Sequence, residues 1–475
     1  MEKSPQRPMK QKNTLGYVIF MAVVAAIGGI LFGYDTAVIS GTTEIVKSQF
    51  ALSDLKEGWY VGCALIGSIC GVLVAGSLSD YLGRKLTMLI SAALFSISAI
   101  GCAVCGSFDG LVAYRIIGGV GIGIVSIVSP IYISEVSPAK IRGTLVSLYQ
   151  LAVTVGFLLA YLANWVIDSN IDTNLVLGDP TLTLWEKMMN TEAWRGMLGS
   201  ETLPALLFFL VIFFIPESPK WLIVNGKLDK AAVVLNKIYS TPEEATEEIK
   251  VTQDSLGGET KGKWSDLLKP GILVAVIAGS AIAILGQFMG VNAVLYYGPK
   301  IFSEAGFDNP MFSTVLVGVV NCVTTILAVF IIDRVGRKQL IYWGVSGMII
   351  CLVAIGIYFA WGSALGLGNM FMLTFFLAYV FCTAISICAV VFVLLSEMYP
   401  NSVRGRAMSI AGFALWIGTY LIGQLTPVLL GWSQAGTFFI FAVMCVPYML
   451  IMWKVIPETT GKTLEEIEAY WTNRK

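Results

Sequence analysis

The sequence predicts an all-α membrane protein in which twelve transmembrane helices form two pseudo-symmetric six-helix bundles, with short cytoplasmic helices between them. Three observations lead to this prediction: the composition, the length of the apolar runs, and a charged motif that occurs twice. Hydrophobic residues make up 56% of the 475 residues and charged residues only 13%, which is too little charge to cover a soluble globule of this size. Lipid is therefore the expected surrounding for most of the surface.

Apolar runs recur along nearly the whole chain. A helix needs roughly 20 apolar residues to cross the hydrocarbon core of a bilayer. No small-residue cleavage site follows a short apolar core near residue 1, so we expect the first run to be a retained span and not a removed signal. The twelve predicted spans are 15–40, 57–79, 86–107, 110–134, 144–168, 197–215, 271–300, 311–332, 339–361, 368–395, 407–431 and 435–455.

One long polar stretch divides the spans into two sets of six. Leu228, Leu235 and Ile238 fall at helical spacing within it, which predicts short amphipathic helices. The expected parts are an N-terminal bundle over 1–215, linker helices over 216–269, a C-terminal bundle over 270–456 and a cytoplasmic tail over 457–475.

The charges indicate how the chain is oriented. The net charge is zero at pH 7, so no basic surface indicates nucleic acid as a partner. Lys and Arg crowd alternate loops, including the N-terminal tail and the stretch 216–270, whereas the loops near 41–56 and 362–369 hold few. The positive-inside rule then places both termini and the linker in the cytoplasm. We expect a multi-pass protein of the cytoplasmic (inner) membrane that is monomeric.

A charged motif occurs in both halves, as Asp80-Tyr81-Leu82-Gly83-Arg84-Lys85 and as Asp333-Arg334-Val335-Gly336-Arg337-Lys338. A second pair of segments shares the pattern Glu-x-x-Pro-x-x-x-Arg-Gly and starts at Glu135 and Glu397. An even number of spans separates the members of each pair, so the halves are expected to be parallel repeats about an axis normal to the membrane. That symmetry is typical of transporters and predicts a cavity between the halves.

The charged residues of these motifs fall at cytoplasmic helix ends in the predicted topology. Charge-assisted pairs between such ends can hold the two halves together when the cavity faces outward, and must break when it faces inward. The alternative is that the charges only fix topology and cap helices, although a topology role needs the cations and not the paired acids. The predicted cytoplasmic gate consists of Asp80, Arg84, Glu135, Arg142, Asp333, Arg337, Glu397 and Arg404.

Asp35, Arg115 and Glu201 lie inside predicted spans, where charge is costly and usually functional. Desolvation favours a protonated Asp35, whereas a nearby Arg115 favours the ionised form, so a switch between these environments would carry a proton. The chain has no histidine, which leaves carboxylates for any proton coupling. The alternative is an ion pair between Asp35 and Arg115 that never titrates. Glu201 either extends the relay or holds Arg195 or Arg142 in place.

Uncharged amide side chains occur in otherwise apolar spans. An amide both donates and accepts hydrogen bonds, which matches the hydroxyls of a sugar, while aromatic rings pack on the C–H faces of a sugar. Hydrogen bonding between helices, worth about 1 kcal/mol each, is the alternative role. The amide residues are Gln150, Gln287, Asn292 and Asn321.

Gly290 and the pair Gly298-Pro299 interrupt the seventh span. Glycine and proline loosen a helix, so we expect this span to bend as a gate.

Four further segments accompany the repeated charged motif. They read Leu31-Phe32-Gly33-Tyr34-Asp35-Thr36-Ala37-Val38-Ile39-Ser40-Gly41, Tyr114-Arg115-Ile116-Ile117-Gly118-Gly119, Pro216-Glu217-Ser218-Pro219-Lys220-Trp221-Leu222 and Pro457-Glu458-Thr459-Thr460-Gly461-Lys462-Thr463-Leu464-Glu465-Glu466. In this order they resemble the sugar porter family of the major facilitator superfamily, and most of all its bacterial D-xylose/proton symporters. The resemblance runs from about residue 15 to about residue 470.

The resemblance implies roles for individual residues. Symporters of the family carry Asp at the position of Asp35 and facilitators commonly carry Asn, so Asp35 beside Arg115 is implied to take the coupling proton. The four amides are implied to contact sugar hydroxyls. Aromatic residues implied to line or close the cavity are Phe32, Tyr296 and Trp416, with Phe392 in place of the family's Trp.

The chain also departs from the family pattern. Gly286 and Phe157 stand in place of Gln, and Leu415 in place of an amide. The tenth span reads Cys388-Ala389-Val390-Val391-Phe392, where the family has Gly-Pro-x-x-Trp. A hydroxyl left without a partner costs about 1–3 kcal/mol. We therefore expect weakened binding of ordinary hexoses or xylose, and allow a deoxy sugar or another less polar substrate.

Proton-coupled symport of a monosaccharide or related polyol by alternating access is the predicted function. Uncoupled facilitated diffusion is the alternative, and a nutrient sensor is less expected because the tail after Pro457 is short. The sequence shows no nucleophile–base pair, metal cluster or cofactor loop. We therefore expect a protein that is not an enzyme and needs no cofactor other than the coupling proton.

Overall fold

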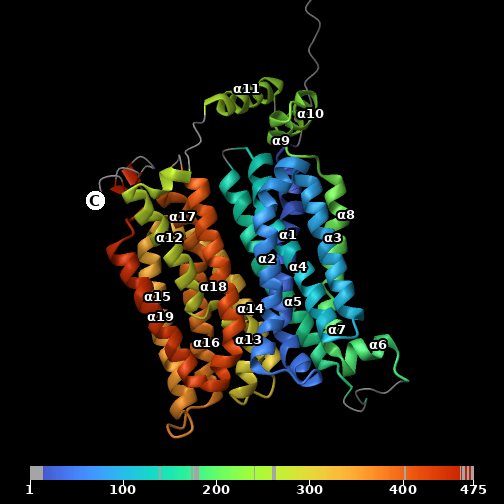
Figure 1. Cartoon of the computed structure of the whole chain (residues 1–475), viewed down its shortest axis with the longest axis vertical. Coiled ribbons are helices and arrows are strands. Elements are labelled where there is room, and N and C mark those ends of the chain that lie inside the picture. Colours follow the sequence, from blue (N-terminus) through green and yellow to red (C-terminus); the bar gives the residue numbers. More distant parts are fainter. Residues whose placement is uncertain are drawn as a thin grey trace, which may run out of the picture.

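The helices of the computed structural model form two groups that stand side by side, the first six spans in one and the last six in the other (Figure 1). Some predictions concern residues outside this description, namely both chain ends and the side chain of Asp333. The structure describes residues 14–138, 141–172, 175, 181–239, 241–258, 264–400, 403–459, 462, 466–467 and 470–471.

Within the part of the chain that the structure describes, twelve helical segments are long and apolar enough to cross a membrane, which confirms the predicted all-α fold with twelve spans. The first five spans are single helices. The sixth is composed of two α-helices and a 3₁₀ turn, and two short helical segments precede it. In order these elements are α1 (Thr14–Gln49), α2 (Asp54–Leu82), α3 (Arg84–Val104), α4 (Phe108–Val136), α5 (Arg142–Ser169), α6 (Leu184–Glu186), η1 (Lys187–Thr191), α7 (Ala193–Gly199), α8 (Thr202–Val211) and η2 (Ile212–Phe214).

The second half has two interrupted spans. The seventh is split into two helices, and the tenth contains a π-helical segment. Its elements are α12 (Pro270–Phe288), α13 (Val291–Glu304), α14 (Pro310–Val335), α15 (Arg337–Trp361), α16 (Asn369–Thr383), η4 (Ala384–Cys388), α17 (Ala389–Met398), α18 (Arg404–Trp432) and α19 (Gln434–Lys454).

The polar linker forms short helices at one end of the bundles (Figure 1). We call this the linker end, and the opposite end, where α6 lies, the loop end. Helix α10 buries Ala231, Leu235 and Ile238, as its apolar spacing predicts. The linker elements are α9 (Pro219–Val224), α10 (Leu228–Ile238), α11 (Pro242–Gly258) and η3 (Trp264–Leu268).

Glycines let neighbouring spans approach closely. A Cβ added at Gly119 of α4 would lie 2.0 Å from the Ala64 carbonyl oxygen of α2, and one at Gly123 would lie 2.2 Å from that of Ser68. No real Cβ tolerates such a distance from a backbone atom, so only glycine permits this spacing. Close packing through small residues is the expected means of association between helices in lipid.

The seventh span breaks where the sequence predicts that it loosens. Gly290 separates α12 from α13 with φ of 91°, in the left-handed region that favours glycine. Tyr297 has non-helical angles of φ −119° and ψ 17°, two residues before Pro299. Helix α13 is therefore a short unit that is bounded by a break and contains a kink.

Candidate functional site

A cluster of three buried ionisable side chains lies inside the first bundle. Arg115 of α4 pairs with Asp35 of α1, with 2.5 Å between Nη1 and Oδ1. Glu201, between α7 and α8, lies beside both. All three residues are at most 3% exposed. The structure thus brings together the three residues that the sequence singles out for proton coupling.

The cluster is short of positive charge. With both carboxyls ionised, two negative charges face one guanidinium, and a single added proton would neutralise the group. Asp35 Oδ2 and Glu201 Oε1 have no hydrogen-bond partner among the residues that the structure describes. Because unpaired charge is expensive away from water, the cluster is suited to hold and release a proton.

The surroundings of Arg195 bear on the alternative role of Glu201. Arg195 pairs with Glu192 and donates to the backbone carbonyls of Ala103 and Cys105. Arg142 lies at the linker end, in the first turn of α5. Glu201 therefore faces Asp35 and Arg115, and no contact among the described residues joins it to Arg195 or Arg142.

Four of the predicted substrate residues form two pairs, one aromatic and one amide. The rings of Phe32 on α1 and Trp416 on α18 lie 6.1 Å apart and join the two halves. Asn292 of α13 donates to the Gln287 side chain of α12 at 2.6 Å, across the break at Gly290.

The other predicted substrate contacts differ in exposure. Tyr296 and Asn321 are buried at 2% and 8% exposure, whereas Phe392 is 54% exposed. Gln150 is also exposed. No described contact joins these four to the Phe32–Trp416 or Gln287–Asn292 pairs, so their assignment to one site stays a prediction.

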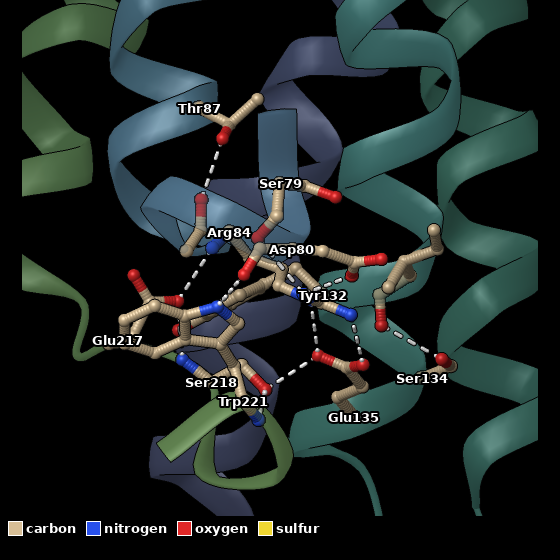
Figure 2. Close-up of polar contacts among 12 residues, drawn as sticks. Ser79, Asp80, Arg84, Thr87, Tyr132, Ser134, Glu135, Glu217, Ser218 and Trp221 are labelled. Carbon is tan, nitrogen blue, oxygen red and sulfur yellow. Dashed lines mark hydrogen bonds and ion pairs between the residues drawn. The ribbon is translucent and has the colours of Figure 1, made fainter. Parts of the chain in front are cut away.

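At the linker end of the first half, Arg84 forms the centre of a polar network (Figure 2). Its guanidinium bonds both carboxylate oxygens of Glu135, at 3.0 Å each. It also donates to Asp80 and to the carbonyl of Ser79, both at 3.0 Å. Bidentate Arg–carboxylate pairs are among the stronger polar contacts in proteins, whereas the Asp80 side chain, 75% exposed, contributes little.

The segment after the sixth span completes this network, which the sequence analysis did not foresee. Glu217 accepts hydrogen bonds from the backbone N–H groups of Arg84 and Lys85, at 2.8 and 3.2 Å. Ser218 donates to Glu135 at 2.5 Å. Burial raises the pKa of Glu217, and its bonds to backbone N–H groups oppose that shift. The recurrence of Pro-Glu-Ser at 216 as Pro-Glu-Thr at 457 was the signal available in the sequence.

The second half repeats the arrangement. Arg337 pairs with Glu397 at 3.0 Å, and Thr459 donates to the other oxygen of Glu397 at 2.6 Å. Glu458 accepts from the backbone N–H of Lys338 at 3.3 Å. The motifs that are duplicated in the sequence therefore also make matching contacts in the two halves. In each half these contacts lie at the linker end of one bundle.

Among the side chains that the structure describes, the contacts found for the predicted gate residues lie within one half. Arg84 with Glu135, and Arg337 with Glu397, are pairs within one half. Arg404 donates to the Tyr399 carbonyl of its own half at 3.3 Å. Arg142 is exposed and lines a cavity of about 230 Å³ beneath α10 and α11, together with Tyr239 and Glu248.

At the loop end, contacts cross between the halves. Lys300 of α13 pairs with Glu57 of α2, with 2.7 Å between Nζ and Oε1. The Tyr161 hydroxyl of α5 donates to the Leu295 carbonyl at 3.0 Å. Further contacts are the hydrogen bond from Gln424 to the Leu55 carbonyl at 2.8 Å and the pair of rings of Trp165 and Phe312 at 5.4 Å.

The comparisons with known proteins match nearly the whole chain. The family model described as "Sugar (and other) transporter" matches residues 21–471. The arabinose-proton symporter of Bacillus subtilis (strain 168) is 38% identical over 470 residues, which cover 98% of each chain. The chain belongs to the sugar porter family of the major facilitator superfamily. It is a membrane transporter of that family and not an enzyme.

Other sugar porters are similar to this chain in sequence and in fold. The D-xylose-proton symporter of Escherichia coli (strain K12) is 39% identical over 500 residues, covering 98% of this chain and 97% of the relative. The inward open structure of the xylose transporter from E. coli superposes with a TM-score of 0.82 at 36% identity, covering 96% of this sugar porter and all of that chain.

Proposed function

We propose that this sugar porter is a proton-coupled symporter of a monosaccharide or related polyol that works by alternating access. The observation that carries the proposal is the buried cluster of Asp35, Arg115 and Glu201, in which two carboxyls share one guanidinium. Similar proteins are named arabinose-proton and D-xylose-proton symporters, which favours a pentose among the candidate sugars.

The proton acts on the packing of α1 against α4. An ionised Asp35 attracts Arg115 strongly because water is excluded from both side chains. Protonation of the cluster weakens that attraction, so α1 can move relative to α4. Because α1 also carries Phe32, which packs on Trp416 of the other half, a change in the cluster is passed to the contact between the halves.

The substrate binds between the halves in this proposal. Phe32 and Trp416 provide apolar faces, and Gln287 and Asn292 provide hydrogen bonds to hydroxyls. A Cβ at Gly286 would be in ordinary van der Waals contact with the side chains of Ile387 and Tyr448 of the second half, at 3.7 and 3.8 Å, so this glycine adds no space for the substrate beside Gln287.

The linker end is cytoplasmic in this proposal, because the basic residues gather there. The loop end, where contacts cross between the halves, is then external, and the structure is an inward-facing state. The predicted cytoplasmic gate residues would exchange partners when the protein turns outward and the linker ends approach.

Uncoupled facilitated diffusion is the second candidate. The short Asp35–Arg115 contact favours it, because a carboxylate held by a guanidinium at 2.5 Å can stay ionised throughout the cycle.

Proton flux with Asp35→Asn separates the two functions. Purified protein in liposomes with an external pH dye is given D-xylose, L-arabinose or D-glucose. A symporter alkalinises the medium as sugar enters. In that case Asp35→Asn keeps sugar exchange but loses the pH change and accumulation. Asp109→Asn, an exposed carboxyl at the start of α4, serves as the control. Sugar entry without a pH change in the unaltered protein would rule out coupling, and no uptake from the panel would rule out these substrates.

A further inference from the structure

We propose that the ion pair of Glu57 and Lys300 is a lock that holds the loop end closed and sets the balance between the two orientations of the transporter. The inference rests on the alternating-access part of the proposed function. It assigns a role to two charged residues that belong to neither the buried Asp35 cluster nor the repeated motifs of the linker end.

The pair joins the halves deep in the closed seam. Glu57 lies in the first turn of α2 and Lys300 in the second half of α13. The Lys300 Nζ donates to both oxygens of the Glu57 carboxylate, at 2.7 and 2.9 Å. The Glu57 side chain is fully buried and that of Lys300 is 9% exposed. Water is excluded from both charges at this depth, so the attraction between them is strong.

Close approach of the helices excludes water from the pair. A Cβ at Gly58 of α2 would lie 2.1 Å from the Gln424 carbonyl oxygen of α18, and one at Gly62 would lie 3.0 Å from the Tyr420 ring. The seam therefore requires glycine at position 58, next to Glu57. Separation of α2 from α18 would admit water and remove the environment in which the ion pair is strong.

Glu57 has a second cation that belongs to its own half. Lys47, near the end of α1, lies 2.7 Å from Glu57 and 2.5 Å from Asp54. When the halves separate at the loop end, Glu57 can remain paired with Lys47 while Lys300 leaves with α13. The carboxylate thus stays neutralised in both states, and the contact that changes is the one to Lys300.

Other charged groups surround Lys300 at this end. Glu44 of α1 and Glu304 of α13 both interact with it electrostatically. Glu304 in turn accepts a hydrogen bond from Gln434 of α19 at 2.9 Å. Opening therefore transfers this cation from Glu57 to water and to Glu304, which lies on the same helix.

Helix α13 connects this lock with the proposed substrate site. The same short helix carries Asn292, which bonds Gln287, and Lys300, which bonds Glu57. The break at Gly290 separates this helix from α12, so it can move independently, and the kink at Tyr297 lets it bend between Asn292 and Lys300. Breaking the ion pair is therefore part of the free energy of opening the loop end to external substrate.

Two lysine variants on the same carboxylate test the inference. Lys300→Gln removes the pair between halves and leaves Glu57 with Lys47. Lys47→Gln removes the pair within one half and leaves Glu57 with Lys300. Hydrogen–deuterium exchange is measured by mass spectrometry on protein in lipid nanodiscs without sugar. For Lys300→Gln we expect faster exchange at residues 54–62 and 291–304 and slower exchange near 84–90 and 337–343, on the order of tenfold. Lys47→Gln should shift neither end in this way.

The opposite signs at the two ends distinguish a change of orientation from loss of stability, because partial unfolding would speed exchange at both ends. Glu57→Gln should reproduce Lys300→Gln, and the double variant Glu57→Gln with Lys300→Gln should retain the shift without a buried unpaired charge. Equal behaviour of the two lysine variants, or faster exchange at both ends, would overturn the inference. The measurement needs neither sugar nor a proton gradient, so it can succeed or fail independently of the proposed substrate and coupling.

Discussion

The two ends of the molecule use polar contacts in different ways. At the linker end, charged motifs bond within their own half, as Arg84 does with Glu135 and Arg337 with Glu397. At the loop end, bonds such as Glu57–Lys300 cross from one half to the other. The difference indicates that the linker-end networks keep each bundle rigid, whereas the loop-end contacts determine how the bundles are placed relative to each other.

This division agrees with rocking of rigid bodies about a central site. The bundle networks can persist through the cycle because they span no moving boundary. In the proposed alternating-access cycle the loop-end seam is broken and remade each time, so its contacts should be reversible.

The largest effect is expected from a side chain in the closed seam. Gly58→Ala places a Cβ within 2.1 Å of the Gln424 carbonyl oxygen, so the loop end cannot close as observed. We expect sugar uptake to fall by on the order of tenfold or more, measured in liposomes with whichever panel sugar the unaltered protein transports. Gly76→Ala on the same helix is the control, since nothing lies within 4 Å of that position. Normal uptake by Gly58→Ala would show that the seam does not close this tightly.

A smaller effect, on the stability of the protein, should follow when an arginine is removed from the linker-end network of one bundle. Arg84→Met leaves Glu135, 8% exposed, without its cation, and should cost about 2–4 kcal/mol of stability. Arg337→Met leaves Glu397 at 25% exposure, where water compensates more, so about 1–2 kcal/mol is expected. Thermal unfolding in detergent compares the two variants. A larger loss for Arg337→Met would contradict the idea that burial sets the difference.

The smallest effect is expected from a neutral contact across the seam. Gln424→Leu removes the hydrogen bond to the Leu55 carbonyl, which is exposed and uncharged. Its loss should shift the balance between orientations by at most about 1 kcal/mol, which is less than the roughly 1.4 kcal/mol that corresponds to the tenfold shift expected for Lys300→Gln. Hydrogen exchange at residues 54–62 measures both. If Gln424→Leu and Lys300→Gln change the exchange rate at these residues equally, the charge of Lys300 is not what stabilises the closed loop end.

The spans were predictable because the thickness of the bilayer imposes a length on apolar runs. The fourth span, expected over 110–134, is observed as Phe108–Val136. The first span was predicted to end at 40 but continues as a helix to Gln49. Its last turns are polar, and Lys47 in them forms ion pairs with Asp54 and Glu57. A count of apolar residues along the chain does not predict such pairs.

The buried charges were also predictable, since an ionisable residue within a span has few explanations. Asp35 and Arg115 were expected to meet and do so. The pairing of Glu57 with Lys300 was not predicted. Each residue stands at the edge of a predicted apolar run, where charged residues are common and do not indicate a buried site. Their partnership depends on which helix ends face each other across the halves.

By itself the sequence determined the class of protein, the number of spans, the duplicated motifs and the acid within the first span, because these follow from composition, length and repetition along the chain. The tertiary structure decided which charges pair. It placed Glu217 on the backbone of Arg84, Glu201 beside Asp35, and Lys300 against Glu57. A charge in lipid needs a partner, but the identity of that partner is set by helix packing, which brings together residues far apart in the chain.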